Sequence, residues 1–117
     1  MEQKRHSLSI GRLAALTHCN IETIRYYEKI ELLSQPLRTQ GGHRLYDETS
    51  QEQLVLICQA RSLGFQIAEI RDLLCLVGGH YPADESAERA TEYVSAIRLK
   101  IRALRSLQHS LEAIAFE

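Results

Sequence analysis

The sequence predicts a mainly α-helical fold with one small β-hairpin and a long C-terminal helix. Three observations carry this prediction. Apolar residues recur at steps of three and four along most of the chain, a glycine pair separates two strand-like segments within 36–46, and residues 85–117 contain no Pro or Gly. At 117 residues, the chain suits one domain, or a small domain with an extended dimerisation element.

Charge is unevenly distributed along the chain, although the formal net charge is only −1. Residues 1–46 hold seven Lys/Arg against four Asp/Glu, whereas residues 47–117 hold seven against eleven. A basic front is typical of a protein that presents one end to phosphate groups. There is no run of eighteen apolar residues, and the polar start lacks the apolar core of a signal peptide, so we expect a cytoplasmic protein without a membrane partner.

Residues 9–30 predict two short helices joined by a tight turn. Ser9 and Asn20 are favoured N-cap residues, because their side chains can accept a hydrogen bond from an unpaired amide of the first turn. Residues 17–19 form the turn between the helices. Two helices with these proportions are typical of a helix-turn-helix, whose second helix enters the major groove of DNA.

The second of these helices has two distinct faces. Ile24, Tyr27 and Ile30 recur every three residues and are expected to pack. The other face, expected to meet a partner, carries Glu22, Arg25, Tyr26 and Lys29.

Arg25 and the adjacent tyrosines each allow two interpretations. Arg25 could contact a base or phosphate, or could form a surface ion pair with Glu22 or Glu28. Tyr26 and Tyr27 are adjacent and point about 100° apart, so only one can lie in the core. We expect Tyr27 to pack and Tyr26 to reach the DNA backbone.

Residues 36–46 predict a hairpin, with a strand on each side of Gly41-Gly42. Alternation places Arg44 and Tyr46 on one side of the second strand, and His43 and Leu45 on the other. We expect Leu45 to anchor the hairpin, while Arg44 and Tyr46 offer a cation and a phenol to phosphate. Arg38 lies across the turn, and His43 either contacts DNA or is simply a polar residue beside the turn.

Two further helices should follow the hairpin. Asp47, with the cap-forming residues after it, begins a third helix, for which Gly64 is the expected C-cap. A fourth helix runs from Gln66 to Val77 and ends at the next glycine pair, before a loop at 80–84.

A long helix is predicted from Glu85 almost to Glu117, with a heptad seam of apolar residues along it. At ~1.5 Å per residue it would be about 48 Å long, too long to bury its apolar face against so small a head. No second helix of matching length exists in this chain, so we expect a homodimer. The predicted interface residues are Val94, Ile97, Ile101, Leu104, Leu111 and Ile114.

Three segments together resemble the signature of MerR-type transcriptional regulators: Ile-Arg-Tyr-Tyr-Glu at 24–28, Gly-His-Arg-Leu-Tyr at 42–46, and Leu-Gly-Phe-Gln-Ile-Ala-Glu-Ile at 63–70. The likeness runs from about residue 7 to 76 and continues loosely to the end. It implies a winged helix-turn-helix at 7–48 (helix-turn-helix 9–30, wing 36–46), a two-helix connector at 49–79, and a helix at 85–117 that pairs antiparallel in a homodimer.

The resemblance also implies a mechanism. A homodimer grips a palindromic site in double-stranded promoter DNA and distorts it, so that RNA polymerase engages promoter elements that are set too far apart. In this chain Arg25 and its neighbours would read bases, and the wing would contact phosphates. The predicted DNA-binding residues are Arg12, Asn20, Thr23, Arg25, Tyr26, Arg38, His43, Arg44 and Tyr46.

Metal-sensing members of that family carry cysteine ligands at the start of the long helix and after its end. The matching positions here fall close to Pro82 and Phe116, which cannot bind metal, so no metal cofactor is predicted and the effector stays open. We expect the cysteines at 19, 58 and 75 to be small buried residues in a reducing cytosol. Cys75 and His80, with Asp84, are weak candidates for a metal site.

Other classes of function are less well supported. The sequence has no Gly-rich phosphate motif, no His-Glu-x-x-His and no Gly-x-Ser-x-Gly, so an enzyme is not expected. Two alternatives remain: a metal-responsive activator that is truncated or lacks its ligand loop, and a coiled-coil interaction module that does not bind DNA.

Overall fold

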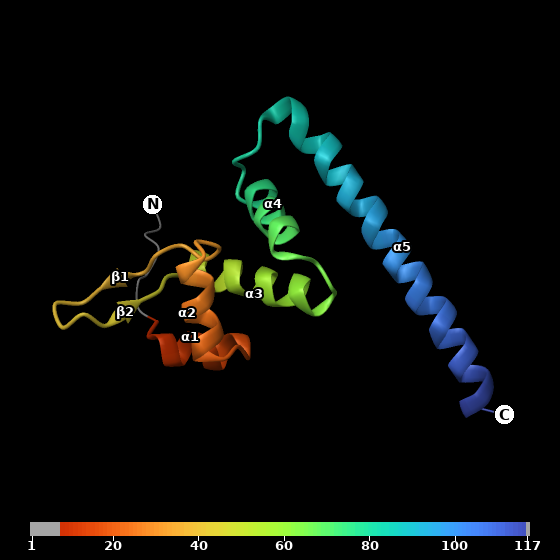
Figure 1. Cartoon of the computed structure of the whole chain (residues 1–117), viewed down its shortest axis with the longest axis horizontal. Helices are drawn as coiled ribbons and strands as arrows, with labels where there is room; N and C mark the ends of the chain where they lie inside the picture. The colour runs from red at the N-terminus through yellow and green to blue at the C-terminus, as the bar shows by residue number, and fades with distance from the viewer. Residues whose placement is uncertain (1–7, 117) are drawn as a thin grey trace. The chain divides into compact units, whose positions relative to one another are not determined.

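The computed structural model describes residues 8–116, and its helical content confirms the predicted mainly α-helical fold (Figure 1). Ser7 and Glu117, where the predicted domains begin and end, lie outside the described residues. The elements in chain order are α1 (Ile10–Thr17), α2 (Ile21–Lys29), β1 (Leu37–Arg38), β2 (Arg44–Leu45), α3 (Glu48–Ser62), α4 (Ile67–Val77) and α5 (Ala83–Ala115).

The chain forms two compact units, which divide within α4 between Leu74 and Cys75. The finer division into a head at 7–48, a connector at 49–79 and a coiled coil at 85–117 stays a prediction.

Side-chain caps explain where the helices of the first unit begin. The Ser9 hydroxyl accepts from the Arg12 amide at 3.1 Å, and Asn20 Oδ1 accepts from the amide of the second residue of α2 at 2.8 Å. Asp47 caps α3 in the same way. The Gln66 amide donates to Glu69 Oε1 at 2.9 Å, which is half of a capping box at the start of α4. The predicted caps at Ser9, Asn20 and Asp47 are confirmed.

The core of the first unit is apolar and draws on four helices and the wing. α1, α2 and α3 pack together beside the hairpin (Figure 1). The largest fully buried side chains are Leu13, Ile24, Leu33, Tyr46, Leu54, Ile57 and Ile70. Each buried side chain of this size contributes about 1.5–3 kcal/mol relative to exposure, so the helix-turn-helix and the wing share one stabilising core.

The predicted hairpin turn is formed, and the predicted end of α3 is shifted by one residue. β1 and β2 pair antiparallel with Leu37 opposite Leu45, and Gly42 has a φ of 83° in the connecting turn. At the end of α3 the C-cap is Leu63, not Gly64 as predicted. Gly64 is the next residue, with a φ of 91°, a left-handed conformation that glycine adopts without steric cost.

Helix α5 begins at Ala83, two residues before the predicted start. Pro82 lies at its N-cap position with a φ of −56°, which suits a helix start. At ~1.5 Å per residue, its 33 residues extend about 50 Å. Among the described residues no helix combines the length and apolarity that a membrane crossing requires.

Candidate nucleic-acid interface

The outer face of α2 is open to solvent, as its sequence predicts. Ile24 and Tyr27 are buried, whereas Arg25 and Tyr26 are each about half exposed. Arg25 Nη1 lies 3.5 Å from Glu22 Oε1, so Arg25 does form a surface ion pair with Glu22. An exposed pair of this kind contributes only ~0.5 kcal/mol, and a nucleic acid can therefore displace it at little cost.

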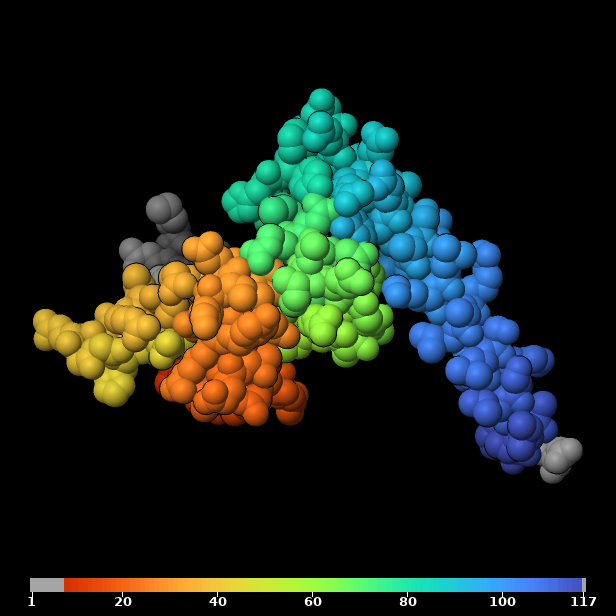
Figure 2. All heavy atoms as spheres, viewed as in Figure 1, coloured from red at the N-terminus to blue at the C-terminus, as the bar shows by residue number. Residues whose placement is uncertain are grey.

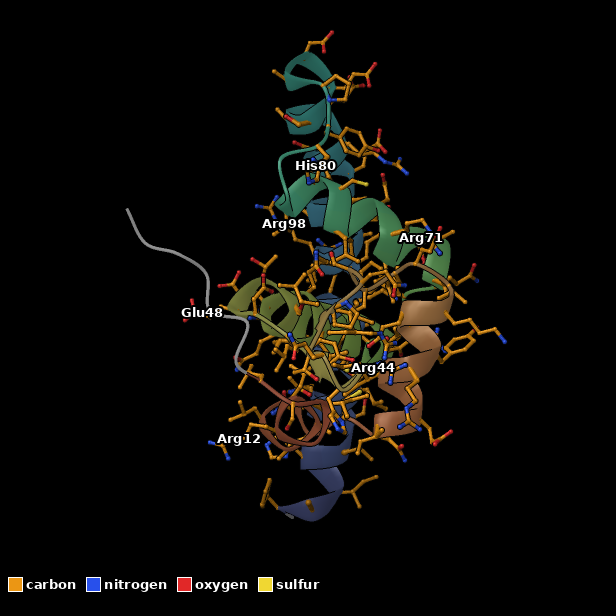
Figure 3. The ribbon with its side chains drawn as sticks, turned by 90° about the vertical axis from the view of Figure 1, so that its left-hand side faces the viewer. Arg12, Arg44, Glu48, Arg71, His80 and Arg98 are labelled. Atoms are coloured by element: carbon orange, nitrogen blue, oxygen red, sulfur yellow. The ribbon has the colours of Figure 1, made fainter. Side chains whose placement is uncertain are left out.

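Three other predicted contacts lie in the first turn of α1 and at the start of α2. Arg12 is exposed on α1, and its side chain points away from the neighbouring elements in Figure 3. Asn20 is exposed, and because its side-chain oxygen caps α2, its amide nitrogen is the group left to donate. Thr23 is half-buried. Arg12 and Asn20 are thus accessible on the helix-turn-helix, and Thr23 is accessible in part.

A buried carboxylate ties the wing to α2. Glu28 is 4% exposed. Its Oε1 accepts from Arg44 Nε at 3.0 Å, and its Oε2 accepts from the Tyr46 hydroxyl. At the base of the wing, Tyr46 also exchanges two backbone hydrogen bonds with Leu8, of 2.8 and 3.1 Å. Because a buried charge is costly unless it is paired, this arrangement fixes where the wing sits relative to α2.

The prediction that Tyr46 offers its phenol to phosphate is wrong. Its side chain is fully buried, and its hydroxyl is used by Glu28. Burial raises the pKa of Tyr46 well above its ordinary value of 10.0, and the hydrogen bond to Glu28 and the charge of that carboxylate raise it further. Strand alternation correctly groups Tyr46 with Arg44, but that side of the strand faces α2.

Arg44 is also partly buried and bound to Glu28. Its side chain is 24% exposed, with Nε bound to Glu28, and Figure 3 places it among the side chains beside α2. Leu45, the predicted anchor, is only half-buried. The anchor of the wing is therefore the polar cluster of Glu28, Arg44 and Tyr46.

The tip of the wing carries exposed polar groups. Arg38 and His43 are both exposed, and the wing stands out from the atoms of α1 and α2 in Figure 2. Arg38 Nη1 donates to the Gly42 carbonyl at 2.9 Å, and the His43 amide donates to Thr39 Oγ1 at 3.1 Å. The guanidinium and the imidazole thus lie close to the turn, where a duplex could reach them.

Sequence reasoning missed the roles of two residues. The sequence suggests Glu28 only as a partner for Arg25. Glu28 nevertheless lies four residues after Ile24 and so shares the buried face, which is the signal for a paired internal charge. Arg71 on α4 donates to the carbonyls of Ile30 at 3.0 Å and Glu31 at 3.2 Å. About forty residues separate Arg71 from these carbonyls, so no local pattern indicates the contact.

Comparison with known proteins connects this geometry to a family. The model of the MerR HTH family regulatory proteins matches residues 8–75, and a second model, "MerR, DNA binding", matches residues 51–114. The chain belongs to the MerR family. It is a DNA-binding transcriptional regulator.

Individual relatives agree with this family membership. The regulator ZntR of Escherichia coli K12 is 37% identical over 107 residues, covering 90% of this chain and 76% of ZntR. Heavy metal-dependent transcription regulator 2 of Rhizobium meliloti is 30% identical over 109 residues, covering 92% of this chain and 74% of that regulator. The crystal structure of PbrR691 from Ralstonia metallidurans in complex with lead(II) matches with a TM-score of 0.61 and 31% sequence identity. The match covers 92% of this chain and 85% of the PbrR691 chain.

In this MerR-family chain, α5 carries the predicted seam on its surface. Exposed fractions of the seam side chains run from 40% to 72%. Figure 2 shows the C-terminal part of α5 as a rod one helix thick. The exposed apolar residues of the seam are Val94, Ile97, Ile101, Leu104, Leu111 and Ile114.

The weak metal candidates are not brought into a three-ligand site. Between residues 8 and 116, no group of three or more His, Cys, Asp or Glu side chains is placed to hold a metal ion. Cys75, His80 and Asp84 therefore do not form the site that their spacing suggested. Cys75 and His80 are joined instead through the backbone, where the His80 amide donates to the Cys75 carbonyl at 2.9 Å.

Proposed function

We propose that this MerR-family regulator binds a palindromic promoter site as a homodimer and controls transcription by distorting the DNA. One observation carries the proposal: the cationic outer face of α2 is open, and the buried Glu28 holds the wing against the same helix. Helix and wing can therefore meet a duplex as one rigid surface.

Within this surface the residues have different tasks. Arg25, exposed on α2, would read base edges in the major groove, because a guanidinium can donate two parallel hydrogen bonds to guanine. Arg12, Tyr26, Arg38 and His43 would contact the backbone, which fixes the position of the protein without reading sequence. Arg44 and Tyr46 would position the wing, and only the exposed part of the Arg44 guanidinium would reach a phosphate.

The homodimer is supported by α5. A stripe of half-exposed Ile, Leu and Val side chains at heptad spacing is unfavourable in water, and a second copy of α5 would cover it. We propose that the two helices pair antiparallel about a two-fold axis. The axis would present two heads to two half-sites, and the operator would mirror that symmetry as a palindrome.

Distortion of the DNA would link binding to transcription. Bending a site of this size costs several kcal/mol, so a small change in the separation of the heads could decide whether RNA polymerase engages the promoter. Because the partner is chromosomal promoter DNA, we place the protein in the cytoplasm, and its proposed function needs no catalytic residue.

A metal-responsive activator is the second candidate, favoured by the names of the relative from Rhizobium meliloti and of the lead(II) complex. The described residues do not fit a resident site of three ligands. A promoter reporter dosed with copper, zinc or lead salts would test this alternative. An induction that Cys75→Ser abolishes and Cys19→Ser leaves intact would support it, whereas equal transcription with and without each salt would exclude it.

Fluorescence anisotropy with genomic fragments selected by the protein, and with a random duplex, tests DNA binding directly. We expect Arg25→Ala to lose most of the preference for the selected site, at a cost of about 1–3 kcal/mol. Arg38→Ala should weaken binding to both duplexes alike and lower the salt slope by about one. Arg105→Ala, an exposed Arg on α5, is the matched control and should change neither property.

Two results would contradict the proposed interface. One is wild-type site preference in Arg25→Ala together with a wild-type salt slope in Arg38→Ala. The other is an absence of binding to any duplex at low salt, which would favour a coiled-coil interaction module instead.

A further inference from the structure

Two cysteines that are far apart in the sequence meet inside the first unit. Cys19 lies in the turn between α1 and α2, and Cys58 lies within α3, 39 residues later. Their Sγ atoms are 3.3 Å apart, and the Cys58 thiol donates to the Cys19 sulfur. Both cysteines are free thiols and both are half-buried. The DNA-binding role of this unit does not explain why two thiols should be adjacent.

The elements on both sides hold the thiols at this separation. The Cys19 amide donates to the Ala14 carbonyl at 3.1 Å, and Cys58 is fixed by the backbone of α3, which packs against α1. A disulfide bond is ~2.05 Å long, so the sulfurs need to approach by only about 1 Å more. Rotation about the two side-chain bonds, with a small shift of the turn, can supply this distance.

We propose that Cys19 and Cys58 form a redox site, in which a hydroperoxide converts the two thiols into a reversible disulfide. A soft metal ion fits the pair less well, because the described residues add no third His, Cys, Asp or Glu ligand to it. In the reducing cytosol the resting state is the dithiol, which is the state of both residues here.

The chemistry proceeds in two steps. The Cys19 sulfur, as a thiolate, attacks the peroxide, forming an S–O bond while the O–O bond breaks; Cys19 becomes a sulfenic acid and the departing hydroxide takes up a proton. Cys58 then attacks the Cys19 sulfur, forming the S–S bond and releasing water with the Cys58 proton. Two thiols lose two electrons in all, and one hydrogen peroxide becomes two waters. A dithiol reductant reverses the reaction by thiol exchange.

The surroundings assign different roles to the two sulfurs. Burial, followed by the hydrogen bond to Cys19, raises the pKa of Cys58 to about 12, so Cys58 ionises less readily than an ordinary thiol. The Cys19 sulfur accepts that hydrogen bond. Cys19 is therefore the attacking residue, and Cys58 is the resolving residue that closes the disulfide.

The Cys19–Cys58 disulfide would act on α2, the predicted recognition helix that enters the major groove. Cys19 directly precedes Asn20, the N-cap of α2, so a pull toward α3 moves the start of α2 and its predicted DNA contacts. This consequence rests on the proposed function. We expect oxidation to weaken binding to the selected promoter site about tenfold, as the loss of one good contact would.

Peptide mapping of the full chain tests the site itself, without DNA. After mild hydrogen peroxide and blocking of the remaining thiols, the parent and Cys75→Ser should contain a peptide pair linked through Cys19 and Cys58, which dithiothreitol releases. Cys19→Ser and Cys58→Ser should lack this link, and Cys58→Ser should retain a sulfenic acid at Cys19 that dimedone traps. Circular dichroism would establish that both serine variants are folded. A parent that forms no such link, or links Cys75 instead, would overturn the proposal.

Anisotropy on the same samples tests the consequence for DNA binding. The oxidised parent should bind more weakly and recover with dithiothreitol, while Cys58→Ser should respond little to peroxide. A mapped disulfide with unchanged affinity would overturn the regulatory role. A reduced parent that binds no duplex would contradict the proposed function, a result distinct from either outcome of the mapping.

Discussion

Glu28 determines how the main groups of the interface are used. Its two carboxylate oxygens accept hydrogen bonds from Arg44 and Tyr46. The guanidinium and the phenol, which the sequence suggests are available to DNA, therefore stabilise the fold instead. Arg25, by contrast, keeps only a surface ion pair. The difference follows from burial, because a carboxylate removed from water must recruit donors whereas an exposed one is already hydrated.

Alkaline pH should reveal the contribution of Tyr46. Its pKa is raised in the folded protein, so the folded state holds the phenol proton more tightly than the unfolded chain. This stability is fully present below pH about 10 and is lost as the pH rises toward the folded pKa, by up to ~1.4 kcal/mol per pH unit. Urea unfolding of the parent and of Tyr46→Phe between pH about 8 and 11 would measure it.

We expect Tyr46→Phe to be about 1 kcal/mol less stable than the parent near neutrality and to lose less stability on the alkaline side. Cys58, whose pKa is raised from 9.0 to about 12, adds a dependence that Tyr46→Phe leaves in place. Cys58→Ser in the Tyr46→Phe background removes that second part. Equal alkaline slopes for the parent and Tyr46→Phe would contradict the raised pKa of the buried Tyr46 phenol.

Residue-scale prediction succeeded where helix geometry was sufficient. A rotation of about 100° per residue correctly placed Tyr27 in the core and Tyr26 in solvent. It failed for Tyr46, because strand alternation tells which side chains share a side but not which side faces the protein. That choice depends on where the hairpin docks, and the docking partner is a carboxylate on α2.

At the scale of elements, Arg71 links α4 to the end of the recognition helix. Its guanidinium donates to the carbonyls of Ile30 and Glu31, and Glu31 has a left-handed φ of 59°. A cation at these carbonyls complements the negative end of the helix dipole. The contact gives the fourth helix a direct influence on the second.

Replacement of Arg71 by Ala should loosen the end of α2. The amides of Leu32 and Leu33, which donate to the Tyr27 carbonyl, should exchange hydrogen about fivefold faster, because two exposed hydrogen bonds together contribute about 1 kcal/mol. Hydrogen-exchange mass spectrometry would measure this change. Arg98→Ala on α5 is the control, and equal exchange in Arg71→Ala and the parent would mean that the contact does not restrain α2.

The helices themselves were predictable element by element. Capping side chains and glycines mark their ends in the sequence, so most predicted boundaries lie within two residues of the structure. The contact of Arg71 was not predictable, since it joins residues whose proximity only the packing of α4 creates.

At the scale of the whole molecule, we propose a two-fold homodimer. The exposed seam of α5 would join its two chains, and α2 and the wing of each chain would contact the DNA. Ile101→Glu would place a charge in the middle of the seam, where the dimer would have to bury it. We expect the variant to be largely monomeric in sedimentation analysis, and to bind the palindrome much more weakly because two heads would no longer act together.

Ser106→Glu is the matched control, since it adds the same charge on the opposite side of the heptad. It should leave the dimer intact. A monomeric parent, or an Ile101→Glu protein that stays dimeric with full affinity, would contradict this assembly.

The sequence by itself determined the helices, the hairpin, the two faces of α2 and the apolar seam, because these depend on periodicity and capping between near neighbours. The tertiary structure alone decided that Arg44 and Tyr46 serve Glu28, that Arg71 holds the end of α2, and that Cys19 meets Cys58. Each of these contacts joins residues at least sixteen positions apart, and the burial that makes them favourable exists only once the helices have packed.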